Sequence, residues 1–394
     1  MKPKIAIYSG RYPDTTFLTL LARNLAKKDF EIHIYGKLIQ KNRDDKKIKF
    51  YTFPFNNKIK TYLFLLKYSI LNFLFNYKKL FLFFKLIHQD NLYLKYKKAL
   101  VILPMLYHKP DIIHLQWLKS YELFNGLSPV LSAKFIVSIR GHQLSISSFI
   151  YPRFKNNTIE ATNEAYKIHS ISDDLSKQLL LINPSVHNKI YKINPAIDLK
   201  LFSISESSLN RDRHMTLKII TVCRLSWKKG LVDAIRALKL IFDKGIDFEY
   251  LIIGDGEQCE ELEFMINDLG LSNKIKLLGK MSQQEVKGYL LNADIFMMPS
   301  VQEGFSNAVI EAQALGLPCI VSDAEGLEEN IENGKTGFVF RKREIAAIAL
   351  LVEKFIAMPK SDYIEMRKNA VIQCRIKYDV NKQIEQFKNL YLDV

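Results

Sequence analysis

Apolar residues in the first part of the chain fall into two short strand-like runs with a helix-like spacing between them. Residues 4–8 and 31–35 are strand-like, and between them Phe17, Leu18, Leu21 and Leu25 recur at helical intervals. A strand, a helix and a second strand in this order form a βαβ unit. Such units pair their strands in parallel, so the pattern predicts a parallel sheet covered by helices.

The same pattern continues and then starts again in the second half. Strand-like runs follow at residues 111–115, 135–139, 167–171 and 189–193. After the polar stretch 203–214, new runs occur at residues 217–222, 248–253, 274–278, 294–298 and 318–321, with a helix at 231–242. We therefore expect two doubly wound Rossmann-like α/β domains, residues 1–204 and 215–394, facing each other across a cleft. The last helix is expected to pack back on the first domain.

Residues 56–109 break this rhythm. They hold ten Lys, one acidic residue and twelve Phe or Tyr, and on a helical wheel the polar positions of residues 62–87 do not share one face. One interpretation is helices packed on the sheet, with lysine side chains reaching out to water. The other is a basic aromatic surface that docks on anionic lipid.

Charge divides the chain in the same way as the strand pattern. The formal net charge is +16, but residues 1–200 carry 32 Lys+Arg against 13 Asp+Glu and residues 201–394 carry 25 against 28. The basic character therefore belongs to the N-terminal half. No helix-turn-helix, zinc-finger or RNA-binding motif accompanies it, so a nucleic-acid partner is not expected.

The four cysteines are widely spaced, and no apolar run is long enough to span a bilayer without interruption. This pattern favours a reducing, cytoplasmic environment, with attachment to the inner face of the cell membrane as the alternative. No metal or resident cofactor is expected.

The strongest chemical motif follows the run at residues 294–298. Glu303 and Gly304 lie in a loop, Ser306 is a good helix N-cap, and the helix is expected to end at Gly316. A helix start with free N–H groups suits a diphosphate. Glu311 lies about 7 Å further along the axis, within reach of ribose hydroxyls, and Glu303 lies on the other side of the phosphates.

A second motif directly follows the run at residues 217–222. Arg224 and Lys229 are two cations five residues apart at the carboxyl end of a strand, where they can grip the same diphosphate.

Together these residues resemble the retaining glycosyltransferases of family 4, which have the GT-B fold. The resemblance is dense over residues 219–340, in Arg224-x4-Lys229-Gly230, Gly254-Asp255-Gly256, Leu278-Gly279, the stretch from Glu303 to Glu311, and Asn333-Gly334-x-Thr336-Gly337. It is looser in the first half, at Pro110–His114, Ser170–Ser172 and Asn194–Asp198.

The resemblance implies a role for each matching residue. Arg224 and Lys229 would neutralise the donor diphosphate, Glu311 would bind the ribose, and Glu303 would contact the donor sugar. Backbone groups of Gly304, Phe305, Ser306 and Asn307 would hold phosphate and sugar hydroxyls, and Gly254 and Gly279 would line the nucleotide site. It also implies a metal-independent reaction without a protein nucleophile.

One departure concerns the family histidine, which follows a strand in the pattern H-G-x-D. Here that place reads Arg140-Gly141-His142-Gln143. The sequence leaves open whether Arg140 or His142 takes the histidine's role.

The resulting hypothesis is a glycosyltransferase that moves a sugar from a nucleotide diphosphate sugar to a lipid-linked surface glycan, such as lipopolysaccharide or capsule. The alternatives are a nucleotide-sugar epimerase of similar fold and an inactive partner subunit. The sugar, the base and the linkage stay open.

Overall fold

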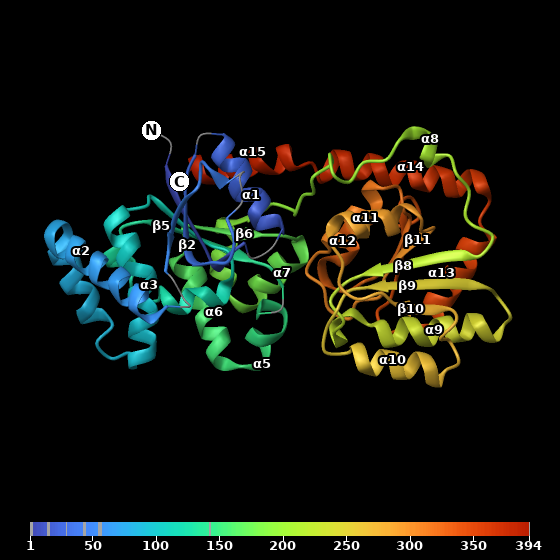
Figure 1. Ribbon diagram of the computed structural model, residues 1–394, viewed down its shortest axis with the longest axis horizontal. Helices are drawn as coiled ribbons and strands as arrows, with labels where there is room; N and C mark the ends of the chain where they lie inside the picture. Colours follow the sequence, from blue (N-terminus) through green and yellow to red (C-terminus); the bar gives the residue numbers. More distant parts are fainter. Residues whose placement is uncertain are drawn as a thin grey trace. The chain divides into compact units, whose positions relative to one another are not determined.

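The computed structural model describes residues 3–13, 16–28, 30–41, 45–53, 57–141 and 143–393, which form two compact units. The first unit comprises the chain up to Asn194 together with Gln383–Val394, and the second is Pro195–Lys382. Each unit is an α/β sandwich around its own parallel sheet (Figure 1). Among the described residues no helix is long and apolar enough to cross a membrane.

The two sheets repeat one strand order. The first runs β3-β2-β1-β4-β5-β6-β7 and the second runs β10-β9-β8-β11-β12-β13, so both are doubly wound from a central pair. The strands of the first sheet are β1 (Lys4–Tyr12), β2 (Glu31–Leu38), β3 (Lys49–Thr52), β4 (Ile112–Leu115), β5 (Lys134–Ile139), β6 (Lys167–Ser170) and β7 (Ile190–Lys192). Those of the second are β8 (Leu217–Val222), β9 (Phe248–Ile253), β10 (Ile275–Leu277), β11 (Ile295–Met298), β12 (Cys319–Ser322) and β13 (Gly337–Phe340). The predicted α/β class with two parallel sheets is confirmed.

Helices cover both sheets. In the first unit they are α1 (Thr16–Lys27), α2 (Lys58–Leu86), α3 (Leu92–His108), α4 (Ser128–Leu131), α5 (Ser148–Ile150), α6 (Pro152–Glu164), α7 (Asp173–Ile182) and the C-terminal α15 (Val380–Leu392), most of which belongs to this unit. In the second unit they are α8 (Glu206–Leu209), α9 (Leu231–Asp243), α10 (Cys259–Asp268), α11 (Gln283–Leu291), α12 (Asn307–Ala314), α13 (Ile345–Ala357) and α14 (Lys360–Lys377).

Two local expectations need correction. The first strand, expected over residues 4–8, continues through Tyr12 as β1, because a register shift between Tyr8 and Gly10 keeps it paired with β2. Strand β3 was not anticipated, because its four residues contain no fully buried side chain and so carry little hydrophobic signal.

The polar stretch 203–214 is ordered against the second unit. Leu209 of α8 is buried, and Arg211 and His214 both contact the fully buried Asp294 at 3.0 and 2.9 Å. A polar stretch between two domains is typical of a flexible linker. Here the buried carboxylate of Asp294 must be paired, and Arg211 and His214 pair it.

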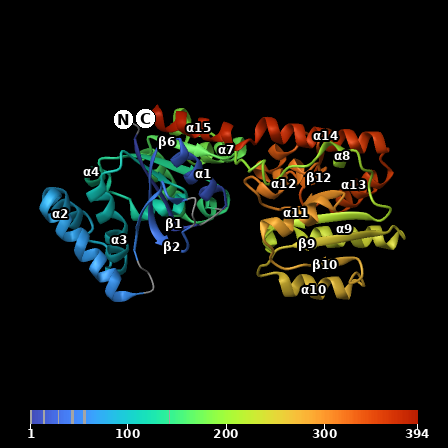
Figure 2. The ribbon, with the colours of Figure 1, turned by 45° about the horizontal axis from the view of Figure 1, so that its top comes forward.

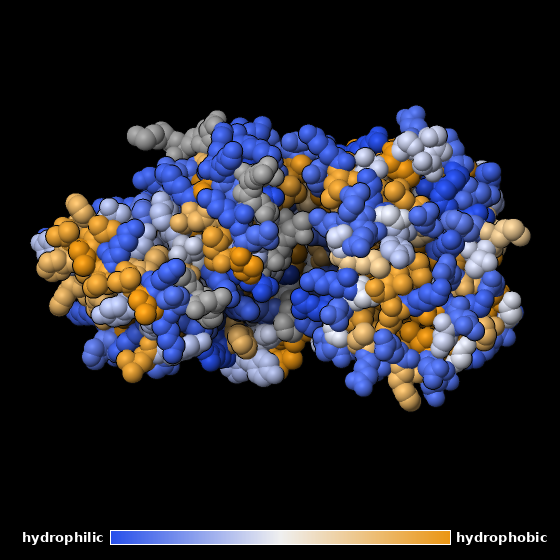
Figure 3. Space-filling view, in the orientation of Figure 1, coloured by the Kyte–Doolittle hydropathy of each residue, from blue (hydrophilic) through white to orange (hydrophobic). Residues whose placement is uncertain are grey.

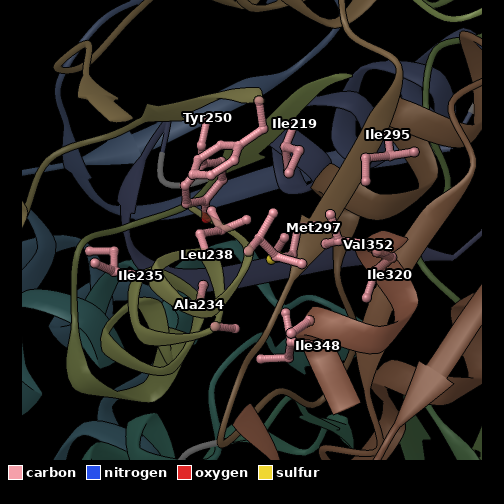
Figure 4. Packing of buried hydrophobic residues seen from close by; sticks show 14 of the residues in the cluster. Ile219, Ala234, Ile235, Leu238, Tyr250, Ile295, Met297, Ile320, Ile348 and Val352 are labelled. Atoms are coloured by element: carbon pink, nitrogen blue, oxygen red, sulfur yellow. The ribbon is translucent and has the colours of Figure 1, made fainter. Parts of the chain in front are cut away.

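The core of the second unit lies between β8–β12 and the helices α9 and α13. Ile219, Tyr250 and Met297 from the strands meet Leu238 of α9 and Ile348 of α13 (Figure 4). Alternate strand residues point to this face, as the pleat requires. This packing holds β8 and β11 in place, and the two loops that carry the chemical motifs follow these strands.

In the first unit a buried chain of hydrogen bonds joins α15 to the sheet. The Ile193 carbonyl can only accept, so His169 Nε2 donates to it at 3.0 Å and Nδ1 accepts from the Ser138 hydroxyl at 2.8 Å. Ser138 in turn accepts from His114 Nε2 at 2.8 Å, and Tyr391 donates to His114 Nδ1 at 2.6 Å. Every bond in the chain therefore has one direction, and both imidazoles are neutral.

Burial keeps both imidazoles uncharged. It lowers the pKa of His169 to about 3, with the charge of Arg140 acting in the same direction. Burial, followed by His169 and Arg140, also holds the pKa of His114 well below its usual range. The chain of hydrogen bonds is stable only while no proton is added to it.

We predict that Tyr391→Phe destabilises the protein by about 1–3 kcal/mol, because the buried His114 Nδ1 loses its hydrogen-bond donor. Chemical unfolding measures the change. Tyr62→Phe is the control, since the Tyr62 side chain is 67% exposed and its loss of a hydroxyl should change stability by less than about 0.5 kcal/mol. Equal effects of both variants would contradict the prediction.

We also predict a loss of stability as pH falls below about 6.5, where an unfolded histidine takes up a proton. The folded-state pKa values of His114 and His169 are lowered, so the unfolded state binds more protons in this window and each imidazole contributes about 1.4 kcal/mol per pH unit. Unfolding measured between pH 6.5 and 4 should show a shallower slope for His169→Asn by about that amount. An unchanged slope would refute neutral burial of His169.

Candidate functional site

The candidate site lies where the strand order of the second sheet reverses. β8 is flanked by β9 on one side and β11 on the other, so the loops after β8 and β11 leave the sheet in opposite directions. Ligands of doubly wound sheets bind beyond the carboxyl ends of the strands at this point. Both motifs of the sequence analysis follow these two strands.

Close backbone contact holds the two loops together. A Cβ on Gly230 would lie 2.0 Å from the Pro299 carbonyl oxygen, and Gly230 has φ +62°, so only glycine fits here. The N–H groups of Val301 and Gln302 both donate to the Lys228 carbonyl, at 2.7 and 3.2 Å. The loop that carries Lys229 is thereby fastened to the loop that carries Glu303.

Lys229 and Glu303 form an ion pair, although they lie 74 residues apart. Both side chains are more than four-fifths buried. Burial lowers the pKa of Lys229, but the attraction of the Glu303 carboxylate outweighs it, so that the pKa lies above its usual value. Glu303 is itself fixed, because its N–H donates to Glu325 at 2.7 Å.

Lys228 is a third cation of the cluster, and no motif in the sequence predicts its role. Burial lowers its pKa, and the charges of Lys229 and Arg224 lower it further. The charged form of Lys228 is thus disfavoured by its surroundings, and a bound anion would remove that penalty. The one sequence signal for Lys228 is its position between Arg224 and Lys229. The sequence does not show that the charges of these two residues act on the Lys228 side chain.

Behind these cations the loops after β8 and β9 are also pressed together. A Cβ on Gly254 would lie 1.7 Å from the Cys223 carbonyl oxygen, and the Gly254 N–H donates to the Gly279 carbonyl at 2.9 Å. The structure therefore brings Gly254 and Gly279 side by side, at the edge that carries Arg224. Burial raises the pKa of Cys223 to about 12, so this side chain stays a neutral thiol.

Helix α12 starts as the sequence predicts. The Ser306 side chain caps it by accepting from the Val309 N–H at 3.4 Å, and Phe305 packs edge-on against Tyr378. The N–H groups of Asn307 and Ala308 have no hydrogen-bond partner in the part of the chain that the structure describes. This helix start can therefore accept an anion beside the loop of Gly304.

The Asn330 side chain holds the backbone of the cap residue Ser306, a role that the sequence pattern does not predict. Its amide oxygen accepts from the Ser306 N–H and its amide nitrogen donates to the Ser306 carbonyl, both at 3.2 Å. The Asn330 carbonyl accepts from Gln313 and Gln373. Hydropathy patterns carry no signal for such a residue, since it is polar and fully buried.

Glu311 lies further along α12 and is largely buried. Burial raises the pKa of its carboxyl to about 7, and a hydrogen bond with Gln283 opposes this rise. Near neutral pH the group is therefore partly protonated, and a ligand that donates hydrogen bonds would favour the charged form.

Arg140 belongs to the first unit, at the carboxyl end of β5. Its guanidinium donates to the side chain of Gln116 at 2.8 Å and to the Gln116 carbonyl at 3.2 Å, and it lies 4.1 Å from the centre of the Phe17 ring. Part of its role is thus structural, and its charge also lowers the pKa values of His114 and His169. His142 lies outside the described residues.

A pocket of about 390 Å³ lies beside this loop, still within the first unit. Its walls are mostly hydrogen-bonding side chains, among them Lys119, Gln143, Asn157 and Glu160. Among the described residues no group of three or more His, Cys, Asp or Glu side chains is arranged to hold a metal ion.

Comparison with known proteins points to one family. Residues 208–373 match the family model described as "Glycosyl transferases group 1". The chain is 39% identical over 145 residues to the amylovoran biosynthesis glycosyltransferase AmsK of Erwinia amylovora, covering 35% of this chain and 36% of that protein. It is 29% identical over 181 residues to an Escherichia coli UDP-Gal:alpha-D-GlcNAc-diphosphoundecaprenol alpha-1,3-galactosyltransferase, covering 44% of each. The chain thus spans less than half the length of these curated relatives.

Among solved structures, Anabaena Alr3699/HepE in complex with UDP and glucose is similar over the whole of both chains, with a TM-score of 0.71 and 17% sequence identity. This similarity concerns the fold, and it confirms the predicted GT-B fold.

We predict that Glu311→Gln stabilises the ligand-free protein at pH 7.5 by about 3 kcal/mol, the order set by a pKa shift from 4.5 to about 7. The folded-state pKa is raised, so the wild type loses stability as pH rises from about 4.5 to 7, and the glutamine avoids this loss. The advantage should vanish near pH 4.5. Thermal unfolding at both pH values measures it, and an advantage that is equal at both would contradict the burial argument.

Proposed function

Since the chain belongs, through residues 208–373, to the group 1 glycosyltransferases, we propose that it transfers a sugar from a nucleotide diphosphate sugar to a lipid-linked surface glycan. The transfer retains the anomeric configuration and uses no metal ion. The observation that carries the proposal is the cluster of Arg224, Lys228 and Lys229, tied to the loop that opens α12.

The diphosphate of the donor lies between the cations and the helix start. Arg224 offers a planar fork of donors and the two lysines offer point charges, while the N–H groups of Asn307 and Ala308 complete the anion site. These groups stabilise the charge that develops on the diphosphate as the bond to the sugar breaks. They can do so without a metal bridge.

Glu303 and Glu311 contact the two remaining parts of the donor, the sugar and the ribose respectively. When the diphosphate takes Lys229 as its counter-ion, the Glu303 carboxylate is released to accept hydrogen bonds from sugar hydroxyls. Glu311 accepts from the ribose, which favours its charged form. The leaving diphosphate takes the proton of the acceptor hydroxyl, so no protein nucleophile is needed.

The first unit supplies the acceptor side, with Arg140, and with His142 as the alternative, as a contact to donor or acceptor. The similarity to a galactosyltransferase whose name includes a diphosphoundecaprenol acceptor supports a lipid-linked acceptor. The excess of Lys+Arg in residues 1–200 fits an anionic surface. We propose that the enzyme works at the cytoplasmic face of the membrane, in capsule or lipopolysaccharide synthesis.

The test begins with a thermal-shift screen of UDP-, GDP- and ADP-sugars, since a bound donor stabilises the folded state. With the preferred donor, we expect Arg224→Ala and Lys229→Ala to lower kcat/KM for nucleoside diphosphate release by about a hundredfold or more, because each removes a charge that acts in the transition state. Glu311→Ala should lower it mainly through a higher KM.

Lys239→Ala is the matched control, since Lys239 pairs on the surface of α9 with Asp243 and should keep full activity. Undiminished turnover in all three site variants would refute the site. Donor binding without release of nucleoside diphosphate would favour the inactive subunit, and an epimerised donor seen by NMR would favour the epimerase.

A further inference from the structure

Helix α2 presents its apolar residues to solvent. Nine large hydrophobic side chains between residues 59 and 77 are 44% to 73% exposed, namely Ile59, Tyr62, Leu63, Leu66, Ile70, Phe73, Leu74, Phe75 and Tyr77. Steps of three and four residues connect the seven that precede residue 75, so these seven form one stripe along the helix. Figure 3 shows hydrophobic surface gathered over α2, and contiguous patches of this kind mark interaction sites.

The polar side of this helix faces the protein. Asn72 is fully buried and donates to the carbonyls of Tyr68 and Leu103, both at 2.8 Å. Tyr68 is also buried, and its hydroxyl shares a hydrogen bond of 3.1 Å with His108 Nε2. α2 packs on α3, which separates it from the sheet (Figure 2). The orientation of α2 is therefore fixed by hydrogen bonds, and the apolar stripe cannot turn inward.

Lysines border the stripe on one side. Before the kink at Asn76, Ile59 and Leu66 form one row and Lys60 and Lys67 form the adjacent row, each with a spacing of seven residues. Beyond the kink, Tyr77 and Lys78 are both exposed. α2 contains six lysines and no acidic residue. A second copy of the chain seated on this stripe would bring like charges together, whereas an anionic surface would meet opposite charge.

We propose that the exposed stripe of α2 binds flat on an anionic lipid bilayer. The apolar row enters the boundary between headgroups and acyl chains, and Lys60, Lys67 and Lys78 pair with lipid phosphates. α2 lies in the membrane plane. The membrane contact itself does not depend on the proposed function. Its biological role does rest on that function, because the contact would hold the first unit close to a lipid-linked acceptor.

The kink of α2 extends the contact surface. Asn76 has non-helical backbone angles, φ −146° and ψ 33°. Beyond it Phe81 and Phe84 are 76% and 49% exposed. A bent helix with aromatic side chains on both arms can follow an interface while its buried residues Leu80 and Phe83 stay packed.

Co-sedimentation of the full chain with vesicles of phosphatidylcholine, with and without phosphatidylglycerol, tests the proposal. We expect binding to the anionic vesicles that weakens as salt rises, since charges at a surface are screened beyond about 8–10 Å. Phe73→Glu should lower the partition coefficient at least about tenfold. The double variant Lys60→Gln with Lys78→Gln should lower it about 25-fold.

Phe264→Glu is the matched control, because Phe264 is 71% exposed on α10 of the second unit and should bind like the wild type. Absence of vesicle binding by the wild type, or wild-type binding by Phe73→Glu, would overturn the proposal. So would a dimer seen by light scattering that Phe73→Glu dissociates while vesicle binding is unchanged.

Release of nucleoside diphosphate from the donor without lipid separates this inference from the proposed function. Phe73→Glu should keep that activity, so loss of vesicle binding alone identifies α2 as the membrane contact. Donor turnover without vesicle binding in the wild type overturns only the membrane contact. The reverse result overturns only the transferase proposal.

Discussion

The candidate donor site depends on one close approach of backbone to backbone. Gly230 lies against the Pro299 carbonyl, and the Lys228 carbonyl accepts two hydrogen bonds from the opposite loop. This contact joins the carboxyl ends of β8 and β11 and so sets Lys229 beside Glu303. A side chain at position 230 would separate the two loops, because its Cβ would overlap the carbonyl oxygen. The electrostatics of the cluster follow from this geometry.

The two units solve the problem of buried polar groups in different ways. In the first, two neutral histidines and two hydroxyls form a chain in which each donor has one acceptor, from Tyr391 to Ile193. In the second, charges are kept close together at the sheet edge, where an anionic ligand can neutralise them. The first arrangement anchors α15 to the sheet. In the second arrangement, burial and the neighbouring cations disfavour the charged form of Lys228, and a bound anionic ligand would favour that form again.

Helix α2 shows how a polar residue can reverse the usual orientation of a helix. Asn72 is held inward by two carbonyl groups, and the larger apolar surface faces out. A single helical wheel over residues 62–87 shows no clean polar face, because polar residues lie both on the exposed side, as Lys67 does, and on the buried side, as Asn72 does. If residues 56–109 were only helices packed on the sheet with their lysines in water, the exposed lysines of α2 would be explained. The exposed apolar stripe of α2 would not be.

The sequence by itself determined the fold class, the strands that carry the chemistry, and the Ser306 cap, because these depend on local spacing and local hydrogen bonds. It also placed Arg224 and Lys229 after a strand, Glu303 in the loop before α12 and Glu311 within that helix, which is sufficient to predict a diphosphate site. Tertiary structure alone decided that Lys228 shares the field of Arg224 and Lys229, that Asn330 supports the cap, and that Asn72 faces inward. Each of these depends on a partner distant in the chain or on the fields of several charges, and no periodicity along the sequence records such contacts.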